Sequence, residues 1–156
     1  MWHRVTTIGI SSALLVWLLA ACSGYTPSEI NYGTDECDYC KMTIADDKFG
    51  TEIITSKGRV LKFDSIECMA AADINSTKND LAIHSRWVTD FNSPRTFMKA
   101  DAALIVATLH QNSPMGIGLV AVDSHTKAAG LIARAGGSIV TWDETKALVT
   151  KAWNLK

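Results

Sequence analysis

Residues 51–67 read TEIITSKGRVLKFDSIE, and the architecture can be worked out from this stretch. Two runs rich in β-branched and aromatic residues, 51–55 and 59–63, are separated by a Ser-Lys-Gly sequence that is typical of a turn. This pattern predicts a β-hairpin. Asp64, with Glu67 three residues later, has the spacing of a helix N-cap and predicts that a short helix follows the hairpin. The stretch therefore predicts a ββα unit.

The rest of the chain continues and then repeats this order. A strand around residues 86–90 closes the first unit. In the second half, residues 116–122 are a strand candidate, residues 128–135 form a short helix, and residues 138–142 form another strand. Asp143 is then placed to cap a last helix at the C-terminus, as Asp64 is placed to cap the first.

Two sequence coincidences support a duplication. GRVLKFD at residues 58–64 matches GSIVTWD at residues 137–143, and KMTI at residues 41–44 resembles PMGI at residues 114–117. Because both coincidences occur in the same order, they predict an α+β fold made of two small pseudo-repeated ββα-type units. The predicted domain covers residues 35–156, with halves at 35–92 and 93–156.

The N-terminus has the layout of a secretory signal. Its apolar run is close to the lower limit for a membrane span, but small residues directly before a cysteine, in Leu19-Ala20-Ala21-Cys22, indicate cleavage. This sequence resembles the bacterial lipobox, which implies that residues 1–21 are removed and Cys22 is acylated. Stable anchoring takes more than one acyl chain, and a lipobox cysteine carries several. Residues 22–34 contain glycine, proline and few bulky apolar side chains, so we expect a flexible tether.

Charge and length limit the function. Without residues 1–21, the chain has 135 residues, with 14 Lys and Arg against 16 Asp and Glu. That length is enough for one ordinary core. A net charge of about −2, without a basic cluster, argues against nucleic acid as a partner. The sequence contains no pair of catalytic carboxylates, nucleophile with base, or phosphate-binding glycine loop, so we expect a binding protein and not an enzyme.

The sulfur-containing residues carry the chemistry. Acylation of Cys22 leaves three thiols, an odd number in an oxidising compartment, which argues against a disulfide framework. Cys37, Cys40 and Met42 lie within six residues, and Met115 occupies the matching place in the second half. Thiolate and thioether are soft donors that select Cu(I). The sequence therefore predicts a Cu(I) site formed by these four residues.

Other interpretations of the same residues remain open. Structural zinc could be held by Cys37 and Cys40 together with Cys68 and His84. A thiol oxidoreductase is the third alternative, although Cys-x-x-Cys here follows a tether and not a strand. Haem attachment is excluded because Lys41 and not histidine follows the second cysteine. The remaining expectations concern single residues: Cys68 as a buried structural thiol, His125 as a solvated residue or auxiliary ligand, and Asp64 and Asp143 as helix caps.

An ordered set of motifs over residues 35–145 resembles the NosL family. The set comprises Cys37-Asp38-Tyr39-Cys40-Lys41-Met42-Thr43-Ile44, Phe63-Asp64, Trp87-Val88-Thr89-Asp90-Phe91, Ser113-Pro114-Met115-Gly116 and Leu119-Val120-Ala121. The resemblance implies a zinc-ribbon-like metal-binding fold and a periplasmic copper-binding lipoprotein that is accessory to nitrous oxide reductase assembly. By the same resemblance, Cys37 or Cys40 and Met115 are the copper ligands. Lys41 stands where such motifs often have glycine.

The resemblance also implies partners and a location. Cu(I) would pass to nitrous oxide reductase or another periplasmic copper acceptor, with the chain held at the membrane by its lipid. Ser23 after the acylated cysteine favours the periplasmic face of the outer membrane. We expect binding and transfer by ligand exchange, with Asp35 and Asp38 favouring the cation by proximity; a homodimer that shares one ion is left open.

Overall fold

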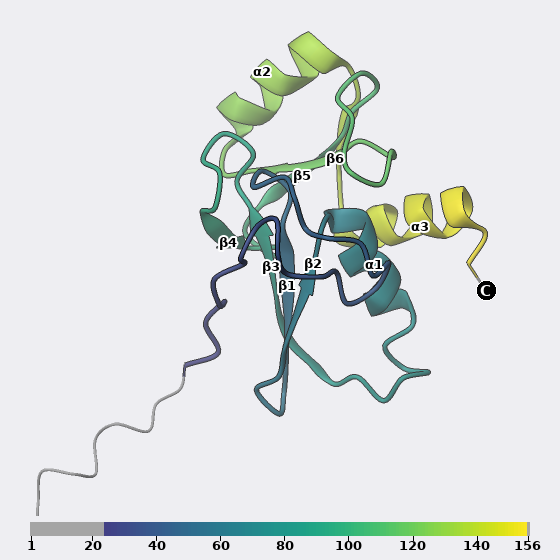
Figure 1. The fold of residues 1–156 in the computed structure, drawn as a ribbon. Helices are drawn as coiled ribbons and strands as arrows, with labels where there is room; N and C mark the ends of the chain where they lie inside the picture. Colours follow the sequence, from purple (N-terminus) through teal and green to yellow (C-terminus); the bar gives the residue numbers. More distant parts are fainter. Residues whose placement is uncertain (1–23, 156) are drawn as a thin grey trace, which may run out of the picture.

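The computed structural model describes residues 24–155, and Figure 1 shows their arrangement. Within this range the chain forms seven strands and three helices. In chain order they are β1 (Thr51–Thr55), β2 (Val60–Phe63), α1 (Ile66–Ile74), β3 (Ile83–Thr89), β4 (Phe97–Lys99), β5 (Leu104–Ala107), β6 (Leu119–Val122), α2 (His125–Ala135), β7 (Ser138–Val140) and α3 (Trp142–Trp153).

The first sheet has the order β2-β1-β3-β4, and every pair in it is antiparallel. The predicted hairpin is confirmed, since Thr51 pairs with Phe63 and Ile54 with Val60. β3 is the predicted closing strand and lies on the other side of β1. β4 was not predicted, and it joins this first sheet although it lies beyond residue 92.

The second sheet has the order β6-β5-β7, again antiparallel throughout. Its elements β5-β6-α2-β7 follow one another as β1-β2-α1-β3 do, with the same strand order, so the α+β repeat is present in the topology. β5 was missed by the sequence patterns. β6 begins at Leu119 and not at residue 116, because Gly116 and Gly118 have positive φ of 83° and 85° that no strand adopts.

The register of the predicted repeat is wrong. Topology matches the passage from β2 into α1 with the passage from β6 into α2, so Asp64 corresponds to Asp123 and not to Asp143. The sequence pattern was misleading because β7 also leads directly into a helix. A turn, a short apolar strand and a helix start have similar residue types wherever they follow one another, so local similarity did not identify the equivalent segment. The caps differ from the prediction too: Ser65 caps α1 and Thr141 caps α3.

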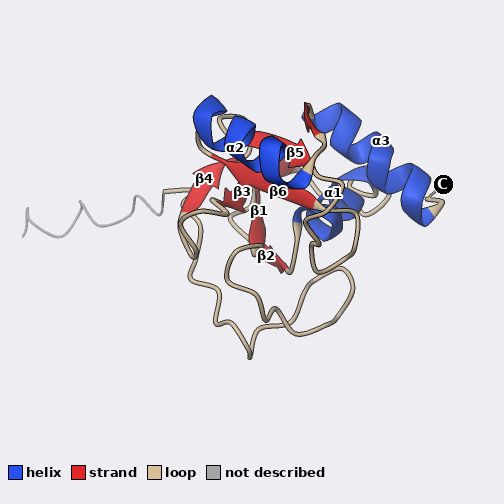
Figure 2. Cartoon of the chain, turned by 90° about the horizontal axis from the view of Figure 1, so that it is seen from above, coloured by secondary structure: helices blue, strands red, loops and turns tan. Residues whose placement is uncertain are grey.

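The second sheet is covered on both faces. Side chains alternate along β5, so that Ile105 faces the large core beneath α1 and Val106 faces a smaller core beneath α2. β6 does the same with Leu119 and Val120. Figure 2 shows α2 over this sheet and α3 beside α1. Because the large core takes residues from both sheets, the two units share one interior.

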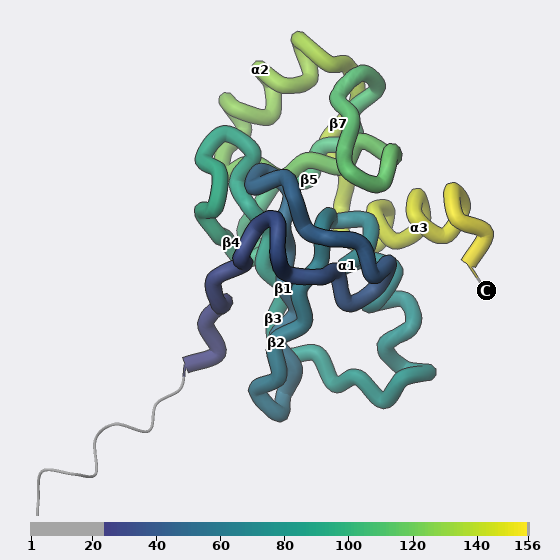
Figure 3. Tube along the Cα trace, viewed as in Figure 1, coloured from purple at the N-terminus to yellow at the C-terminus, as the bar shows by residue number. Residues whose placement is uncertain are grey.

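The described part of the predicted tether, residues 24–34, contacts the first sheet. Tyr25 stacks on His84 with ring centroids 3.6 Å apart, and Ser28 donates through its N–H and hydroxyl to the buried Glu52 carboxylate at 2.9 and 2.8 Å. Figure 3 shows this segment leading into the loops that cross in front of the first sheet. Across residues 24–155, none of the helices has the length and apolar character needed to cross a bilayer.

Candidate metal centre

A tight turn holds Cys37 and Cys40. Its base is closed by an isolated bridge between Glu36 and Thr43, and the Cys37 N–H donates to the Met42 carbonyl at 2.8 Å. The Lys41 N–H donates back to the Cys37 carbonyl at 3.0 Å, with Lys41 at φ +65°. A left-handed residue is what the turn requires, which explains why glycine is common there. This geometry places the two cysteines on one turn.

The turn is fastened to β2 by acidic side chains. The Asp38 N–H donates to the Lys62 carbonyl at 2.7 Å, and the Lys62 N–H donates to Asp38 Oδ2 at 2.8 Å. Lys62 Nζ in turn lies 2.7 Å from Asp35 Oδ2 and lowers the pKa of that carboxyl. Asp35 and Asp38 therefore hold the turn on β2 through these contacts.

The passage from β2 into α1 supplies two more donors. Ser65 caps the helix by accepting from the Cys68 N–H at 3.4 Å, which places Cys68 in the first helical turn. Asp64 precedes the cap and does not form it, contrary to the prediction. Its carboxylate instead faces the cysteines, and Cys40 Sγ donates to Asp64 Oδ2 at 3.7 Å.

The four side chains form a cluster that could hold a metal ion. The sulfur atoms of Cys37, Cys40 and Cys68 and one carboxylate oxygen of Asp64 all lie within 4.8 Å of one another. Cys37, Cys68 and Asp64 are buried, and Cys40 is partly exposed. Asp64 Oδ1 is buried and has no hydrogen-bond partner. Since buried polar atoms are normally paired, this oxygen is free to accept from a donor or to bind a cation.

The thiols differ in acidity. The neighbouring Cys68 thiol lowers the pKa of Cys37 to about 6, against 9.0 for an ordinary thiol. The same contact with Cys37, together with burial, raises the pKa of Cys68. Burial raises the pKa of Cys40 as well. At neutral pH the cluster therefore contains one thiolate that is ready to bind a soft cation and two thiols that must lose a proton to do so.

The NosL family model matches residues 28–149. The chain belongs to the NosL family. Among solved structures, the crystal structure of the copper chaperone NosL from Shewanella denitrificans matches with a TM-score of 0.62 and 20% sequence identity, covering 76% of this chain and 94% of that chain. Among curated proteins there is no match. The NosL fold inferred from the sequence motifs is thus confirmed.

The two methionines of the predicted copper site differ in exposure. Met42 follows the turn and is 48% exposed. It lines a surface cavity of about 400 Å³, whose wall also contains Asp64 and Pro114. Met115 is partly buried and packs against the large core. The cavity wall thus contains Met42, the residue next to Met115, and Asp64 of the cluster.

A buried carboxylate holds the loop before β6 on α1. Glu67 accepts a short hydrogen bond from the Ser113 hydroxyl and a longer one from the Leu119 N–H at 3.4 Å. Burial raises the pKa of Glu67. Ser113 Oγ in turn accepts from the Gly118 N–H at 2.9 Å. The Pro114-Met115 segment is therefore tied to the helix that carries Cys68.

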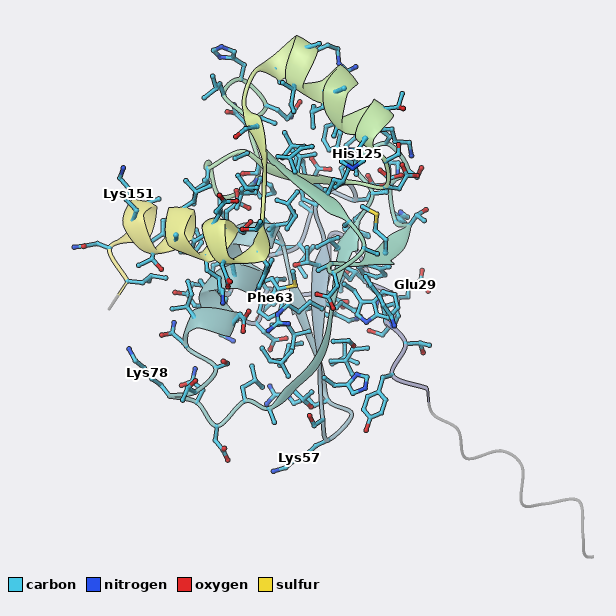
Figure 4. The ribbon with its side chains drawn as sticks, turned by 180° about the vertical axis from the view of Figure 1, so that it is seen from behind. Glu29, Lys57, Phe63, Lys78, His125 and Lys151 are labelled. Atoms are coloured by element: carbon cyan, nitrogen blue, oxygen red, sulfur yellow. The ribbon has the colours of Figure 1, made fainter. Side chains whose placement is uncertain are left out.

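The other predicted residues have different surroundings. His84 stacks on Tyr25 and is not part of the cysteine cluster. His125 is the exposed first residue of α2, as Figure 4 shows, and is not part of the cluster either. Cys22 lies outside the described residues. Sequence reasoning missed Asp64 as a cluster member because its position before a helix suggested a cap, and it treated Cys68 mainly as a structural thiol.

Proposed function

We propose that this NosL-family chain is an extracytoplasmic copper carrier that holds Cu(I) on Cys37, Cys40 and Cys68. One observation carries the proposal: three sulfur atoms and one carboxylate oxygen of Asp64 converge within 4.8 Å, and three of the four residues are buried. Thiolates are soft donors that suit Cu(I). The function is binding and transfer, with copper as cargo.

Release requires a path from this pocket to a partner. Asp64 belongs both to the cluster and to the wall of the cavity that Met42 and Pro114 line. A thioether is a weaker donor than a thiolate, so it suits an intermediate position during ligand exchange. We propose that Met42 and Met115 hold the ion in passing, while the ligands of the acceptor displace the cysteines one at a time.

The acceptor and the location follow from family membership and the N-terminal motif. We propose nitrous oxide reductase, or another periplasmic copper protein, as the recipient. Acylation of Cys22 would hold the chain at a membrane, facing the periplasm, with the outer membrane as the expected site. Metabolic labelling with a palmitate analogue tests the anchor: label should enter the wild-type chain and be absent from the Cys22→Ala variant.

The central experiment is a Cu(I) titration of the reduced full chain in detergent, under anaerobic conditions, against a bathocuproine-type competitor. The wild type should compete for Cu(I), and the Cys37→Ala/Cys40→Ala variant should not. Met115→Ala should bind Cu(I) more weakly, or release it more slowly, with an unchanged circular dichroism spectrum. Retention of wild-type affinity by the double cysteine variant would overturn the assignment.

Structural zinc is the second candidate, because three cysteines and one carboxylate also suit a tetrahedral zinc site. The predicted His84 is replaced in this set by Asp64. A parallel zinc titration separates the two functions. A structural zinc protein should keep zinc on these thiols when Cu(I) is added as a competitor. It should also unfold when zinc is removed. A carrier should keep its fold without metal.

A further inference from the structure

The two helices that follow the hairpins begin in the same way. Ser65 accepts from the Cys68 N–H at 3.4 Å, and Ser124 accepts from the Lys127 N–H at 3.4 Å. An aspartate, Asp64 or Asp123, directly precedes each capping serine. Since both helices also follow the second strand of their unit, Cys68 and Lys127 occupy equivalent positions, the third residue of each helix.

These equivalent positions carry different chemistry. In the first unit, the Cys68 sulfur lies within 4.8 Å of a carboxylate oxygen of Asp64 and of Cys37, which comes from the segment before β1. In the second unit, Lys127 Nζ lies 2.7 Å from Asp123 Oδ2 and 2.8 Å from Asp90 Oδ2. Asp90 directly follows β3 and lies 14 residues before the first residue of β5, as Cys37 lies 14 residues before the first residue of β1.

The Lys127 ammonium group lies between two carboxylates. The Asp90 side chain is only 5% exposed, so its charge needs a partner, and Lys127 supplies it. Hydrogen bonds to the carboxylates of Asp123 and Asp90 raise the pKa of Lys127. This trio contains no sulfur donor, so it offers nothing that selects a soft cation.

We propose that the second unit is a copy of the metal-binding unit in which Lys127 takes the place of the ion. The chain therefore binds one metal ion, in the first unit, and the second unit folds without metal. This inference rests on the proposed function for the first unit, but its own content is the equivalence of the Cys37-Asp64-Cys68 and Asp90-Asp123-Lys127 trios.

The first test is stoichiometry on the full chain in detergent, with Cd²⁺ as a probe whose bound equivalents are counted by elemental analysis after equilibrium dialysis, and with Cu(I) in parallel. The wild type should saturate at one equivalent of either ion. The C37A/C40A/C68A variant should lose that equivalent and retain none. A second tight equivalent that survives in this variant would overturn the proposal, because it would place an ion outside the first unit.

The second test converts the second unit. D90C/K127C replaces the built-in cation with two thiols beside Asp123, and it should bind one more Cd²⁺ equivalent than the wild type. D90S/K127S is the matched control, with similar size and no thiol, and it should add none. A D90C/K127C protein with wild-type circular dichroism that adds no equivalent contradicts the equivalence of the two trios.

The two proposals can fail separately. If the wild type binds neither ion but D90C/K127C gains one equivalent, the copper function fails and the equivalence stands. If the wild type binds one Cu(I) in the first unit and folded D90C/K127C gains nothing, the copper function stands and the equivalence fails. Should D90C/K127C not fold, the stoichiometry of C37A/C40A/C68A decides, since it does not depend on the engineered site.

Discussion

Cys68 is the residue whose role depends most on its surroundings. It is fully buried, as a structural thiol would be, yet its sulfur lies beside those of Cys37 and Cys40. Asp64 is a similar case, because it stands where a helix cap is expected but leaves capping to Ser65 and turns its carboxylate to the cysteines. At this scale the site consists of one thiolate, two thiols and one carboxylate.

Removing the Cys68 sulfur should weaken Cu(I) binding. In Cys68→Ser, we expect the affinity to fall by at least the ~10–100-fold that loss of an outer-shell partner costs at metal sites. The measurement is competition against a bathocuproine-type chelator. The matched control is Met69→Leu. This substitution removes a neighbouring buried sulfur, replaces the side chain with one of similar volume, and should leave the Cu(I) affinity unchanged. Equal affinities for Cys68→Ser and the wild type would show that Cys68 is only structural.

The acidity of Cys37 predicts a pH dependence of stability for the metal-free chain. Its pKa is about 6 in the folded protein and 9.0 for an ordinary thiol, so between these values the unfolded chain holds a proton that the folded chain has lost. Folding stability should therefore rise from pH 6 to pH 9, and this contribution should be lost as the pH falls through 6. Urea unfolding at several pH values under reducing conditions measures it.

The matched variant for this measurement is Cys37→Ala. In this variant, the part of the rise in folding stability with pH that comes from the Cys37 thiol should disappear. Above pH 9 the sign reverses for Cys68, whose raised pKa means that the folded chain keeps a proton that the unfolded chain loses. Wild-type and Cys37→Ala proteins with the same slope between pH 6 and pH 9 would contradict the assignment of the thiolate to Cys37.

At the scale of elements, the site is the meeting point of a turn and a helix start. The turn is fixed by the Lys41 conformation and by its hydrogen bonds to β2, and Tyr39 in the turn stacks on Trp153 of α3 at 5.8 Å. The helix start is fixed by Ser65. Neither element binds metal alone, because each supplies only part of the donors.

The two helix caps allow a matched pair of variants. Ser65→Ala and Ser124→Ala should each destabilise the chain by about 0.5–2 kcal/mol, the usual cost of losing a serine cap. Only Ser65→Ala should also weaken Cu(I) binding, since its cap positions Cys68 in the first turn of α1. Chemical unfolding and the chelator competition measure the two effects. Equal copper affinities in the two variants would argue against a role for the cap in the site.

At the scale of the whole molecule, the second sheet separates two cores. The large core joins both sheets beneath α1, and the smaller one lies beneath α2, on the side that Figure 1 shows away from the first sheet. α3 belongs to the second half but packs beside α1, where Trp142 Nε1 donates to Asp73 Oδ2 at 2.6 Å. The first unit thus depends on the second for part of its interior.

This separation predicts that the α2 core contributes to stability and not to copper affinity. Leu131 is buried in that core, and Leu131→Ala should cost about 2–5 kcal/mol through lost burial and a cavity. Copper affinity measured below the unfolding transition should stay at the wild-type value. A parallel loss of affinity would mean that the smaller core also positions the cysteine cluster.

Much of the molecule was readable from local sequence. The hairpin around Gly58 and the α+β class follow from local pattern, because strand alternation and turn residues act over a few positions. NosL membership came from an ordered set of motifs. Two members of the cysteine cluster were also visible, since Cys37 and Cys40 lie three residues apart and an odd number of thiols argues against a disulfide framework.

Tertiary structure decided what depends on distant contacts. β5 was missed because it is a four-residue strand whose pairing partners lie far along the chain. The register of the repeat changed from Asp143 to Asp123 because strand order, and not local similarity, defines equivalence. The membership of Asp64 and Cys68 in the candidate metal centre was decided in the same way. A donor becomes a ligand through the convergence of side chains in space, and spacing along the chain fixes that convergence only within a single turn.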